Sequence, residues 1–238
     1  MKSLKNKVIL ITGASDGLGK QLAYDLVEEE AILTLISKSK DKLDAVVRNV
    51  KKQGGICQGY VCNVGDEAQV AESVRNIIKS FRTIDVLINN AGIYNEDQRL
   101  VEKPGSIEEM FWTNTLGVMH CTNAVLPLMK QRNAGQILNV VSVAGLEPSA
   151  KWGIYSATKH AERGFTESLK LKLQGTSIKV MGIYPEAIDT NIYKSAGLTF
   201  GHNEPWMMKV EDVSRIIVFM LSQPPDINLS QIVVRKIE

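Results

Sequence analysis

The chain has few cysteines and no cluster of metal-binding side chains. Its three cysteines form no CxxC pair and are odd in number: Cys57, Cys62 and Cys121. This pattern argues against a disulfide framework and is typical of reduced core residues, so we expect a cytoplasmic protein. The three histidines have no ligand spacing among them: His120, His160 and His202. We therefore expect no metal site.

Long hydrophobic runs and an excess of one charge are also lacking. No apolar stretch of the sequence approaches the roughly 18 residues of a membrane span. The apolar run after Lys7 is also too short for the core of a signal peptide. Basic and acidic residues number 28 and 26, which gives a net charge of +2. This balance implies no strong electrostatic field for nucleic acid, so we expect neither a nucleic-acid nor a membrane partner.

Short β-branched runs alternate with helix-period segments along the whole chain. Strands are expected at residues 8–11, 32–36, 56–61, 86–88, 136–141, 178–183 and 231–234. Helices are expected at residues 19–30, 41–52, 66–80, 107–131, 154–173 and 210–221. The alternation predicts one α/β domain over residues 1–238, a doubly wound, seven-stranded and mostly parallel sheet of Rossmann-like form with helices on both faces.

One long irregular insertion, at about residues 186–209, follows the sixth expected strand. In open α/β sheets ligands bind at the carboxyl ends of the strands, so this segment is expected to form a substrate loop. Its apolar residues are expected to cover the substrate or to pack in the core or a subunit interface: Phe200, Trp206, Met207 and Met208.

A glycine-containing loop joins the first strand to the first helix. Gly13, Gly17 and Gly19 lie in the run Thr12-Gly-Ala-Ser-Asp-Gly-Leu-Gly19. Glycines let a backbone turn tightly and approach a pyrophosphate, which the following helix N-terminus attracts. The spacing is GxxxGxG rather than GxGxxG, and a plain strand-to-helix turn is the alternative.

Tyr155 and Lys159 are four residues apart on a predicted helix, so their side chains share one face. A free phenol has a pKa near ~10, and a cation one turn away lowers it toward the working pH of an acid/base catalyst. Lowering the pKa of the phenol by about three units needs roughly 4 kcal/mol of stabilisation of the phenolate relative to the neutral phenol. Taken alone, this spacing is common on amphipathic helices.

Several motifs in one order carry a more specific signal. They are Thr12-Gly13-x-x-x-Gly17-x-Gly19, Asn89-Asn90-Ala91-Gly92, Asn114, Ser142 and Tyr155-x-x-x-Lys159. With these motifs nearly the whole chain resembles the classical short-chain dehydrogenase/reductase family. The resemblance implies an oxidoreductase that uses a nicotinamide cofactor, as a homodimer or homotetramer.

The resemblance also implies catalytic roles for four residues. Tyr155 would be the general acid/base toward the substrate oxygen, and Ser142 would hydrogen-bond the same oxygen. Lys159 would lower the pKa of Tyr155 and bind the nicotinamide ribose. Asn114 would position a water that relays protons to Lys159.

The cofactor contacts implied by the resemblance come from several loops. They are Gly13, Ser15, Asp16, Gly17, Leu18, Gly19, Ser37, Lys38, Asn63, Val64, Asn90, Ala91, Gly92, Tyr155, Lys159, Pro185, Ile188 and Thr190. Two positions depart from the family pattern. Asn63 stands where the family usually has Asp, and Glu186 replaces a glycine beside the expected nicotinamide site.

The end of the second strand bears on which cofactor is used. NAD-dependent proteins typically carry an acid there for the ribose hydroxyls. Here the run is Ser37-Lys-Ser-Lys40, with Lys38 where many NADP-dependent members have a basic residue. We therefore expect NADP to be preferred, with NAD possible; a solvated lysine-rich turn is the alternative interpretation.

The predicted function is hydride transfer between NADP(H) and a carbonyl compound or secondary alcohol, with Tyr155 as general acid/base. The carboxyl-terminal segment 232–238 lacks the glycine-rich run of the family's fatty-acid-synthesis reductases, which argues against an acyl-carrier-protein substrate. Two alternatives stay open: an NAD-dependent alcohol dehydrogenase, and a catalytically silent nucleotide-sensing or scaffold protein.

Overall fold

The computed structural model describes residues 3–96, 106–198 and 202–237. Its centre is a seven-stranded sheet in the order β3-β2-β1-β4-β5-β6-β7. Every neighbouring pair of strands is parallel, which confirms the doubly wound arrangement. The strands are β1 (Val8–Thr12), β2 (Ile32–Ser37), β3 (Ile56–Val61), β4 (Val86–Asn89), β5 (Gly135–Val140), β6 (Ile178–Pro185) and β7 (Gln231–Val234).

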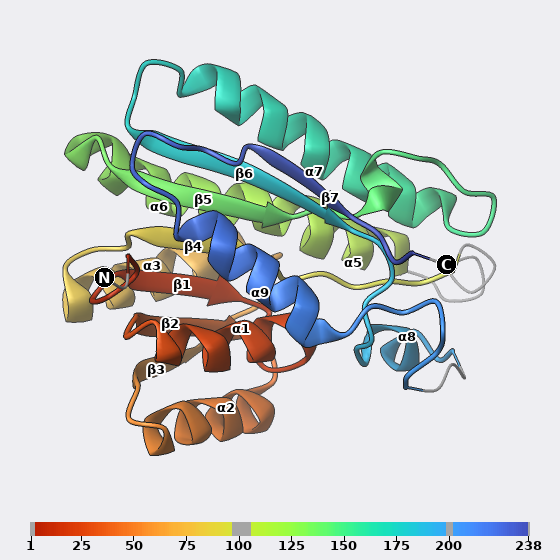
Figure 1. Ribbon diagram of the computed structural model, residues 1–238, viewed down its shortest axis with the longest axis horizontal. Coiled ribbons are helices and arrows are strands. Elements are labelled where there is room, and N and C mark those ends of the chain that lie inside the picture. The colour runs from red at the N-terminus through yellow and green to blue at the C-terminus, as the bar shows by residue number, and fades with distance from the viewer. Residues whose placement is uncertain (1–2, 97–105, 199–201, 238) are drawn as a thin grey trace.

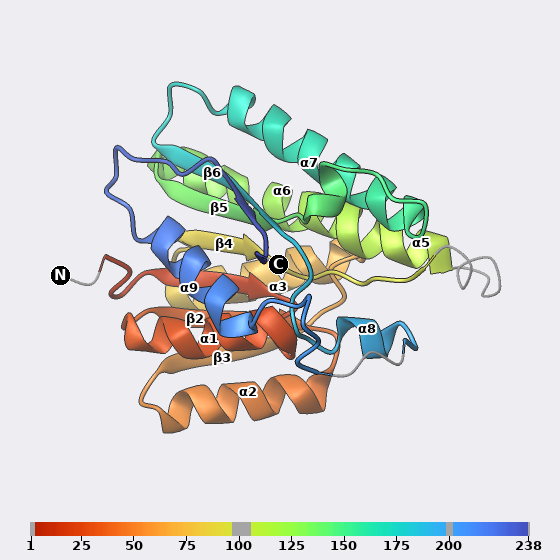
Figure 2. The same cartoon turned by 45° about the vertical axis from the view of Figure 1, so that its right-hand side comes forward.

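Helices cover both faces of the sheet (Figures 1 and 2). One face carries α1 (Gly17–Glu28), α2 (Lys40–Lys52) and α9 (Val210–Leu221), and the other carries α3 (Glu67–Phe81), α6 (Gly117–Arg132) and α7 (Gly153–Lys172). Ile9 and Ile11 of β1 pack in the first layer and Leu10 in the second, because successive strand side chains point to opposite faces.

The expected helix over residues 107–131 is interrupted in the structure. It consists of α5 (Ser106–Phe111), the π-helical segment η1 (Trp112–Leu116) and α6. Such one-turn π segments are frequent at functional sites. This one contains Asn114, whose side chain is fully buried. Two further short elements were not expected, the 3₁₀ turn η2 (Val143–Gly145) and α8 (Ile192–Ser195).

Polar side chains tie the middle of the sheet to its helices. Asn89 of β4 donates hydrogen bonds to Asn139 of β5 at 2.9 Å and to Thr122 of α6 at 3.2 Å. Asn139 in turn donates to Thr166 of α7 at 2.8 Å. Because all four side chains are buried, these bonds fix the two helices to the strands that end at the pocket described below.

The segment after β6 folds back on itself. Ile188 forms a parallel bridge with Met208, which belongs to a hydrophobic core cluster, and Met207 is buried as well. Trp206 is 43% exposed and contacts Tyr193 edge-on. Phe200 lies outside the described residues. The two methionines thus pack in the core, while Trp206 is partly exposed.

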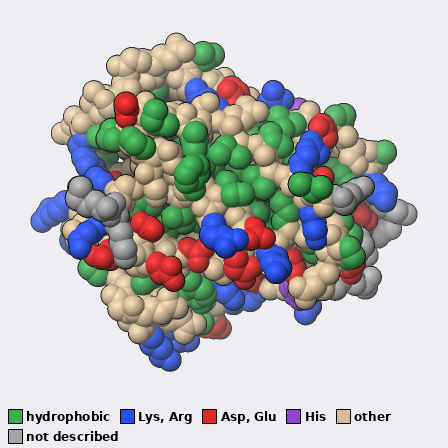
Figure 3. All heavy atoms as spheres, in the orientation of Figure 1, with side chains coloured by type: hydrophobic (Ala, Val, Ile, Leu, Met, Phe, Trp, Pro, Cys, Tyr) green, Lys and Arg blue, Asp and Glu red, His purple; other side chains and the backbone are tan. Residues whose placement is uncertain are grey.

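Apolar side chains also reach the surface near the end of the chain. Figure 3 shows hydrophobic side chains gathered over the face on which β7 and α9 lie. Phe219, Ile227 and Val233 are among the exposed large hydrophobic residues of this part of the chain. Within the described residues, no helix combines the length and the apolar character that a membrane span requires.

Candidate active site

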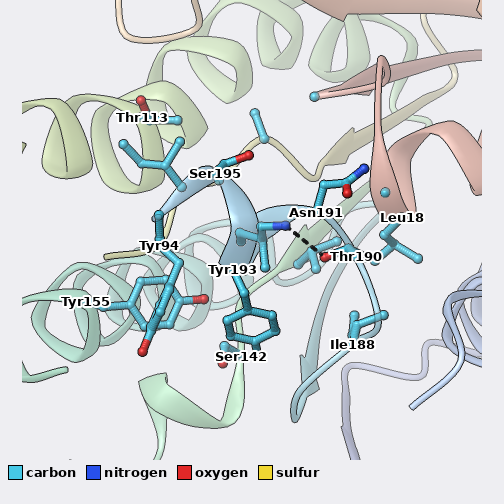
Figure 4. A pocket seen from close by; sticks show the side chains of 18 of the residues that line it. Leu18, Tyr94, Thr113, Ser142, Tyr155, Ile188, Thr190, Asn191, Tyr193 and Ser195 are labelled. Atoms are coloured by element: carbon cyan, nitrogen blue, oxygen red, sulfur yellow. Dashed lines mark hydrogen bonds between the residues drawn. The ribbon is translucent and has the colours of Figure 1, made fainter. Parts of the chain in front are cut away.

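A pocket of about 1400 Å³ opens at the carboxyl ends of the strands (Figure 4). It extends across the point where the strand order reverses between β1 and β4, the position at which open α/β sheets bind ligands. Pockets for a single drug-sized ligand have volumes of roughly 300–1,000 Å³. This pocket is therefore large enough for a dinucleotide together with a small second molecule.

The glycine loop forms one wall of the pocket. Gly13 has φ +64°, and a Cβ atom there would lie 2.7 Å from the Cα atom of Ala91. At Gly19 a Cβ atom would lie 2.5 Å from the Asn90 side-chain nitrogen. These glycines let the loop pack directly against residues 90–92, and Asp16 caps α1 by accepting a hydrogen bond from Gly17 N–H at 2.8 Å. Of the predicted loop residues, only Gly19 does not line the pocket.

Thr12 fastens this loop to the end of β4. Its Oγ1 accepts hydrogen bonds from the backbone N–H groups of Asn90 and Ala91, both at 3.0 Å. The Asn90 side chain donates back to the Thr12 carbonyl oxygen at 2.9 Å. Two strands that are far apart in the sequence are thus held together where the pocket begins.

Two lysines line the pocket near the end of β2, Lys38 directly after the strand and Lys42 in the first turn of α2. Lys38 is paired with Glu109 of α5 at 3.1 Å and Lys42 with Asp16 at 2.9 Å. Lys42 was not predicted as a site residue, because a lysine in a basic run is most simply solvated. Burial raises the pKa of Asp16, but hydrogen bonds, first from Lys42 and then from Asn191 and Gly17 N–H, outweigh it and leave that pKa below its usual value.

Hydroxyl and amide groups lie beside these lysines. Ser37 donates to Ser15 at 2.7 Å, and both serines line the pocket. Asn63 and Val64 line it as well. Asn63 uses its side-chain oxygen to accept from Gly65 N–H at 3.1 Å, which shapes the turn after β3 without the charge of an aspartate.

Tyr155 and Lys159 line the pocket from successive turns of α7, as their spacing predicts. The Lys159 Nζ lies 5.9 Å from the centre of the Tyr155 ring. The ammonium is nearly buried and donates to the Val140 carbonyl oxygen at 3.0 Å and to Glu162 Oε2 at 2.7 Å. Burial lowers the pKa of Lys159, but the electrostatic effect of Glu162, then that of Tyr155, and the hydrogen bond to Glu162 outweigh it and raise that pKa overall.

Ser142 follows β5 and faces the same pocket. Its Oγ accepts a hydrogen bond from Ala144 N–H at 3.1 Å. Its φ of +147° is a conformation that residues other than glycine rarely adopt and that costs of order 1–3 kcal/mol. Such strained positions cluster at functional sites because the surrounding structure must hold them.

Asn114 lies behind the pocket rather than on its wall. Its side-chain oxygen accepts from Ile93 N–H at 2.8 Å, and its side-chain nitrogen donates to the Ile93 carbonyl oxygen at 2.8 Å and to Thr158 at 3.2 Å. A Cβ atom at Gly92 would lie 3.6 Å from Asn114 Oδ1 and 3.8 Å from Lys159 Nζ. Asn114 therefore joins the loop after β4 to α7 beside the lysine.

The segment after β6 closes the opposite side. Pro185, Ile188 and Thr190 line the pocket, and the missing side chain of Gly17 leaves room for Thr190. Glu186, which replaces the family glycine, lies 3.6 Å from Arg235, so its charge is partly balanced.

A series of aromatic ring contacts begins at Tyr155. The Tyr94 ring lies edge-on to three others, with distances between ring centres of 5.1 Å to Tyr155, 5.4 Å to Tyr193 and 6.5 Å to Trp152. The ring centres of Tyr193 and Trp206 are 5.8 Å apart. Figure 4 shows the side chains of Tyr94, Tyr155 and Tyr193 gathered together in the pocket. Tyr94, Trp152, Tyr193 and Trp206 are called the aromatic wall below. Sequence reasoning found only Trp206, because the others come from segments far apart in the sequence with no shared motif: the stretch after β4, the start of α7 and the short helix α8.

The parallel sheet, with a glycine loop at its switch point and a tyrosine–lysine pair in the same pocket, defines an NAD(P)-dependent oxidoreductase. The family model described as short chain dehydrogenase matches residues 7–199. The chain belongs to that family.

Relatives and solved structures agree with this assignment. An uncharacterized oxidoreductase of Listeria monocytogenes is 31% identical over 98% of this chain and 97% of the relative. An alcohol dehydrogenase from the archaeon Thermococcus sibiricus, complexed with 5-hydroxy-NADP, is 25% identical with a TM-score of 0.88 over 97% of each chain. The closed form of a serine dehydrogenase complexed with NADP+ is 26% identical with a TM-score of 0.86, over 96% of this chain and 94% of that one.

The contacts of Thr12 yield a direct test. Thr12→Val preserves shape but leaves the N–H groups of Asn90 and Ala91 without their acceptor, so we expect a loss of about 1–3 kcal/mol in the free energy of unfolding. Thr12→Ser keeps the hydroxyl and should lose about 1 kcal/mol or less. Chemical denaturation measures both variants. Equal stability of the two would contradict the structural role given to Thr12.

Proposed function

We propose that this protein transfers hydride between NADP(H) and a carbonyl compound or the corresponding secondary alcohol, with Tyr155 as general acid/base. The observation that carries the proposal is the convergence of Tyr155, Lys159 and Ser142 on one pocket large enough for a dinucleotide and a substrate. When bound, the reduced nicotinamide supplies the hydride that attacks the carbonyl carbon. The residues supply position, charge and the proton.

In the reduction, the Tyr155 hydroxyl donates its proton to the carbonyl oxygen as the alcohol forms. Ser142 donates a hydrogen bond to the same oxygen and holds it in line. The ammonium of Lys159 stabilises the phenolate that Tyr155 becomes, because a nearby opposite charge favours the charged form. In the oxidation the same groups act in reverse, with the phenolate taking the proton of the alcohol.

Asn114 acts indirectly in this scheme. It is fully buried and does not line the pocket. Its side chain is hydrogen-bonded to the backbone of Ile93 and to the Thr158 hydroxyl of α7. We propose that it fixes the loop beside Lys159, and that any water relaying protons to the lysine lies against this junction.

The cofactor contacts proposed here follow from the pocket lining. The predicted cofactor residues apart from Gly19 line the pocket. Lys38 and Lys42, together with the hydroxyls of Ser37 and Ser15, supply cations and donors for a 2′-phosphate at the end of β2. Two structures similar to this chain contain 5-hydroxy-NADP and NADP+. Glu109 and Asp16, now paired with the lysines, would give up these contacts when the phosphate binds.

The aromatic wall bears on the substrate. Rings around Tyr155 favour a carbonyl compound with an apolar or cyclic body, whose faces pack on aromatic side chains. The similar structures are named for an alcohol and for serine, so likeness alone assigns no substrate.

A cytoplasmic location and a homodimer or homotetramer remain predictions, the latter supported by the exposed apolar residues near β7.

Removing the Tyr155 hydroxyl tests the proposed chemistry. With Tyr155→Phe we expect NADPH-dependent reduction of a panel of cyclic and aromatic ketones to fall by about 100- to 10,000-fold, the usual contribution of a general acid. NADPH binding, measured by fluorescence, should be nearly unchanged. The control is Tyr24→Phe on α1, outside the residues that line the pocket, which should keep wild-type turnover. Wild-type turnover in Tyr155→Phe would exclude this mechanism.

A neighbouring pair of lysines tests the cofactor preference. A charge-assisted hydrogen bond contributes about 1.5–3 kcal/mol, so Lys38→Ala should weaken NADPH binding by roughly 10- to 100-fold while changing NADH binding little. The matched control is Lys40→Ala, because Lys40 is exposed, is paired with Asp44 and does not line the pocket. Calorimetric titration with both nucleotides measures the effect. An equal loss for NADPH and NADH would contradict 2′-phosphate binding by Lys38.

A further inference from the structure

Glu162 is a buried acid directly behind the lysine of the active site. It lies three residues after Lys159 on α7, and its Oε2 accepts from Lys159 Nζ at 2.7 Å. The two side chains are 1% and 5% exposed. Buried ion pairs commonly cost as much in desolvation as they gain in attraction, so stability alone gives a weak reason for this one.

The Lys159 ammonium and the Glu162 carboxyl differ in how far their hydrogen-bonding capacity is used. Two of the three Lys159 N–H groups are engaged by Glu162 and Val140 within the described chain, which leaves one for a ligand in the pocket. On Glu162, Oε1 is buried and has no hydrogen-bond partner among residues 3–96, 106–198 and 202–237. Burial raises the pKa of Glu162 to about 7, although Lys159 acts in the opposite direction. This carboxyl can therefore hold or release a proton near neutral pH.

Other titratable groups near the pair come from α7 and β6. Tyr155 faces Lys159 from the pocket side. Tyr184 of β6 is fully buried, and its pKa is raised by burial first, then by Glu167 and, more weakly, by Glu162. Arg163 acts on Tyr184 in the opposite direction. Glu162 is hydrogen-bonded to Lys159, whereas Tyr155 acts on Lys159, and Glu162 on Tyr184, through their charges.

We propose that Glu162 is a positioning residue for Lys159, and that its charge sets how much of the ammonium's charge acts on Tyr155. This inference rests on the proposed roles of Tyr155 and Lys159. An ionised Glu162 holds the ammonium against α7 and offsets its charge. A protonated Glu162 is neutral, so the full positive charge acts on the phenol and favours the phenolate. Glu162, Lys159 and Tyr155 then titrate as a coupled set.

The sign of the effect follows from the charges. Alcohol oxidation needs the phenolate form of Tyr155, so its rate rises with pH through an acid limb. A carboxylate at Glu162 opposes a second negative charge nearby and moves this limb to higher pH. Removing the carboxylate must move the limb to lower pH.

The test is the pH profile of kcat/KM for alcohol oxidation with NADP+ in Glu162→Gln. We expect the acid limb to move down by about one pH unit, at the low end of what one nearby charge produces. Glu162→Asp keeps the charge and should leave the limb close to the wild-type position while lowering kcat. The matched control is Glu167→Gln, because Glu167 forms an i,i+3 pair with Lys170 at 2.7 Å on the same helix but is 42% exposed.

Three outcomes would overturn the proposal. An unmoved limb in Glu162→Gln would make Glu162 purely structural, and a limb at higher pH would mean that Lys159 had lost its proton. If the variant does not fold, Glu162→Asp decides instead, because wild-type kcat in that variant would exclude a positioning role for the carboxylate. Absence of turnover in the wild type with any carbonyl or alcohol would instead reject the proposed function, which separates the two failures.

Discussion

The contacts of the buried Lys159 ammonium are the interactions on which the proposed active site depends. Its Nζ lies where β5, α7 and the loop after β4 meet, held by the Val140 carbonyl and by Glu162. Charges act strongly in such a place because little water screens them. The same position brings the ammonium within 5.9 Å of the Tyr155 ring centre. One cation thus links the folded core to the phenol that we propose as the acid/base group.

The fold supplies this arrangement through its polar junctions. Thr12 joins the end of β1 to the segment after β4, and Asn114 joins that segment to α7. Farther inside, Asn89 and Asn139 hold β4 and β5 against their helices. Each junction lies near the carboxyl ends of the strands. The pocket is consequently lined by groups whose backbones are fixed, as a site that must align a cofactor with a substrate requires.

Much of this could be predicted from the sequence, since strands such as Val8–Thr12 are continuous apolar runs and α7 keeps Tyr155 and Lys159 on one face. The π-helical turn around Asn114 could not, because hydrophobic periodicity does not report a local change in backbone hydrogen bonding. Most of the aromatic wall was missed since Tyr94, after β4, and Tyr193, in α8, lie about a hundred residues apart in the sequence. Glu162 was missed because helical spacing does not show that a charged residue is buried.

Transfer of an isotopic label tests the central claim most directly. NADPH in which both hydrogens at carbon 4 of the nicotinamide are replaced by deuterium would be incubated with the wild-type protein and a ketone that it reduces. The account predicts one deuterium on the carbinol carbon of the product and none in the solvent, detected by mass spectrometry and NMR. A product formed without the label at that carbon would contradict direct hydride transfer in this pocket.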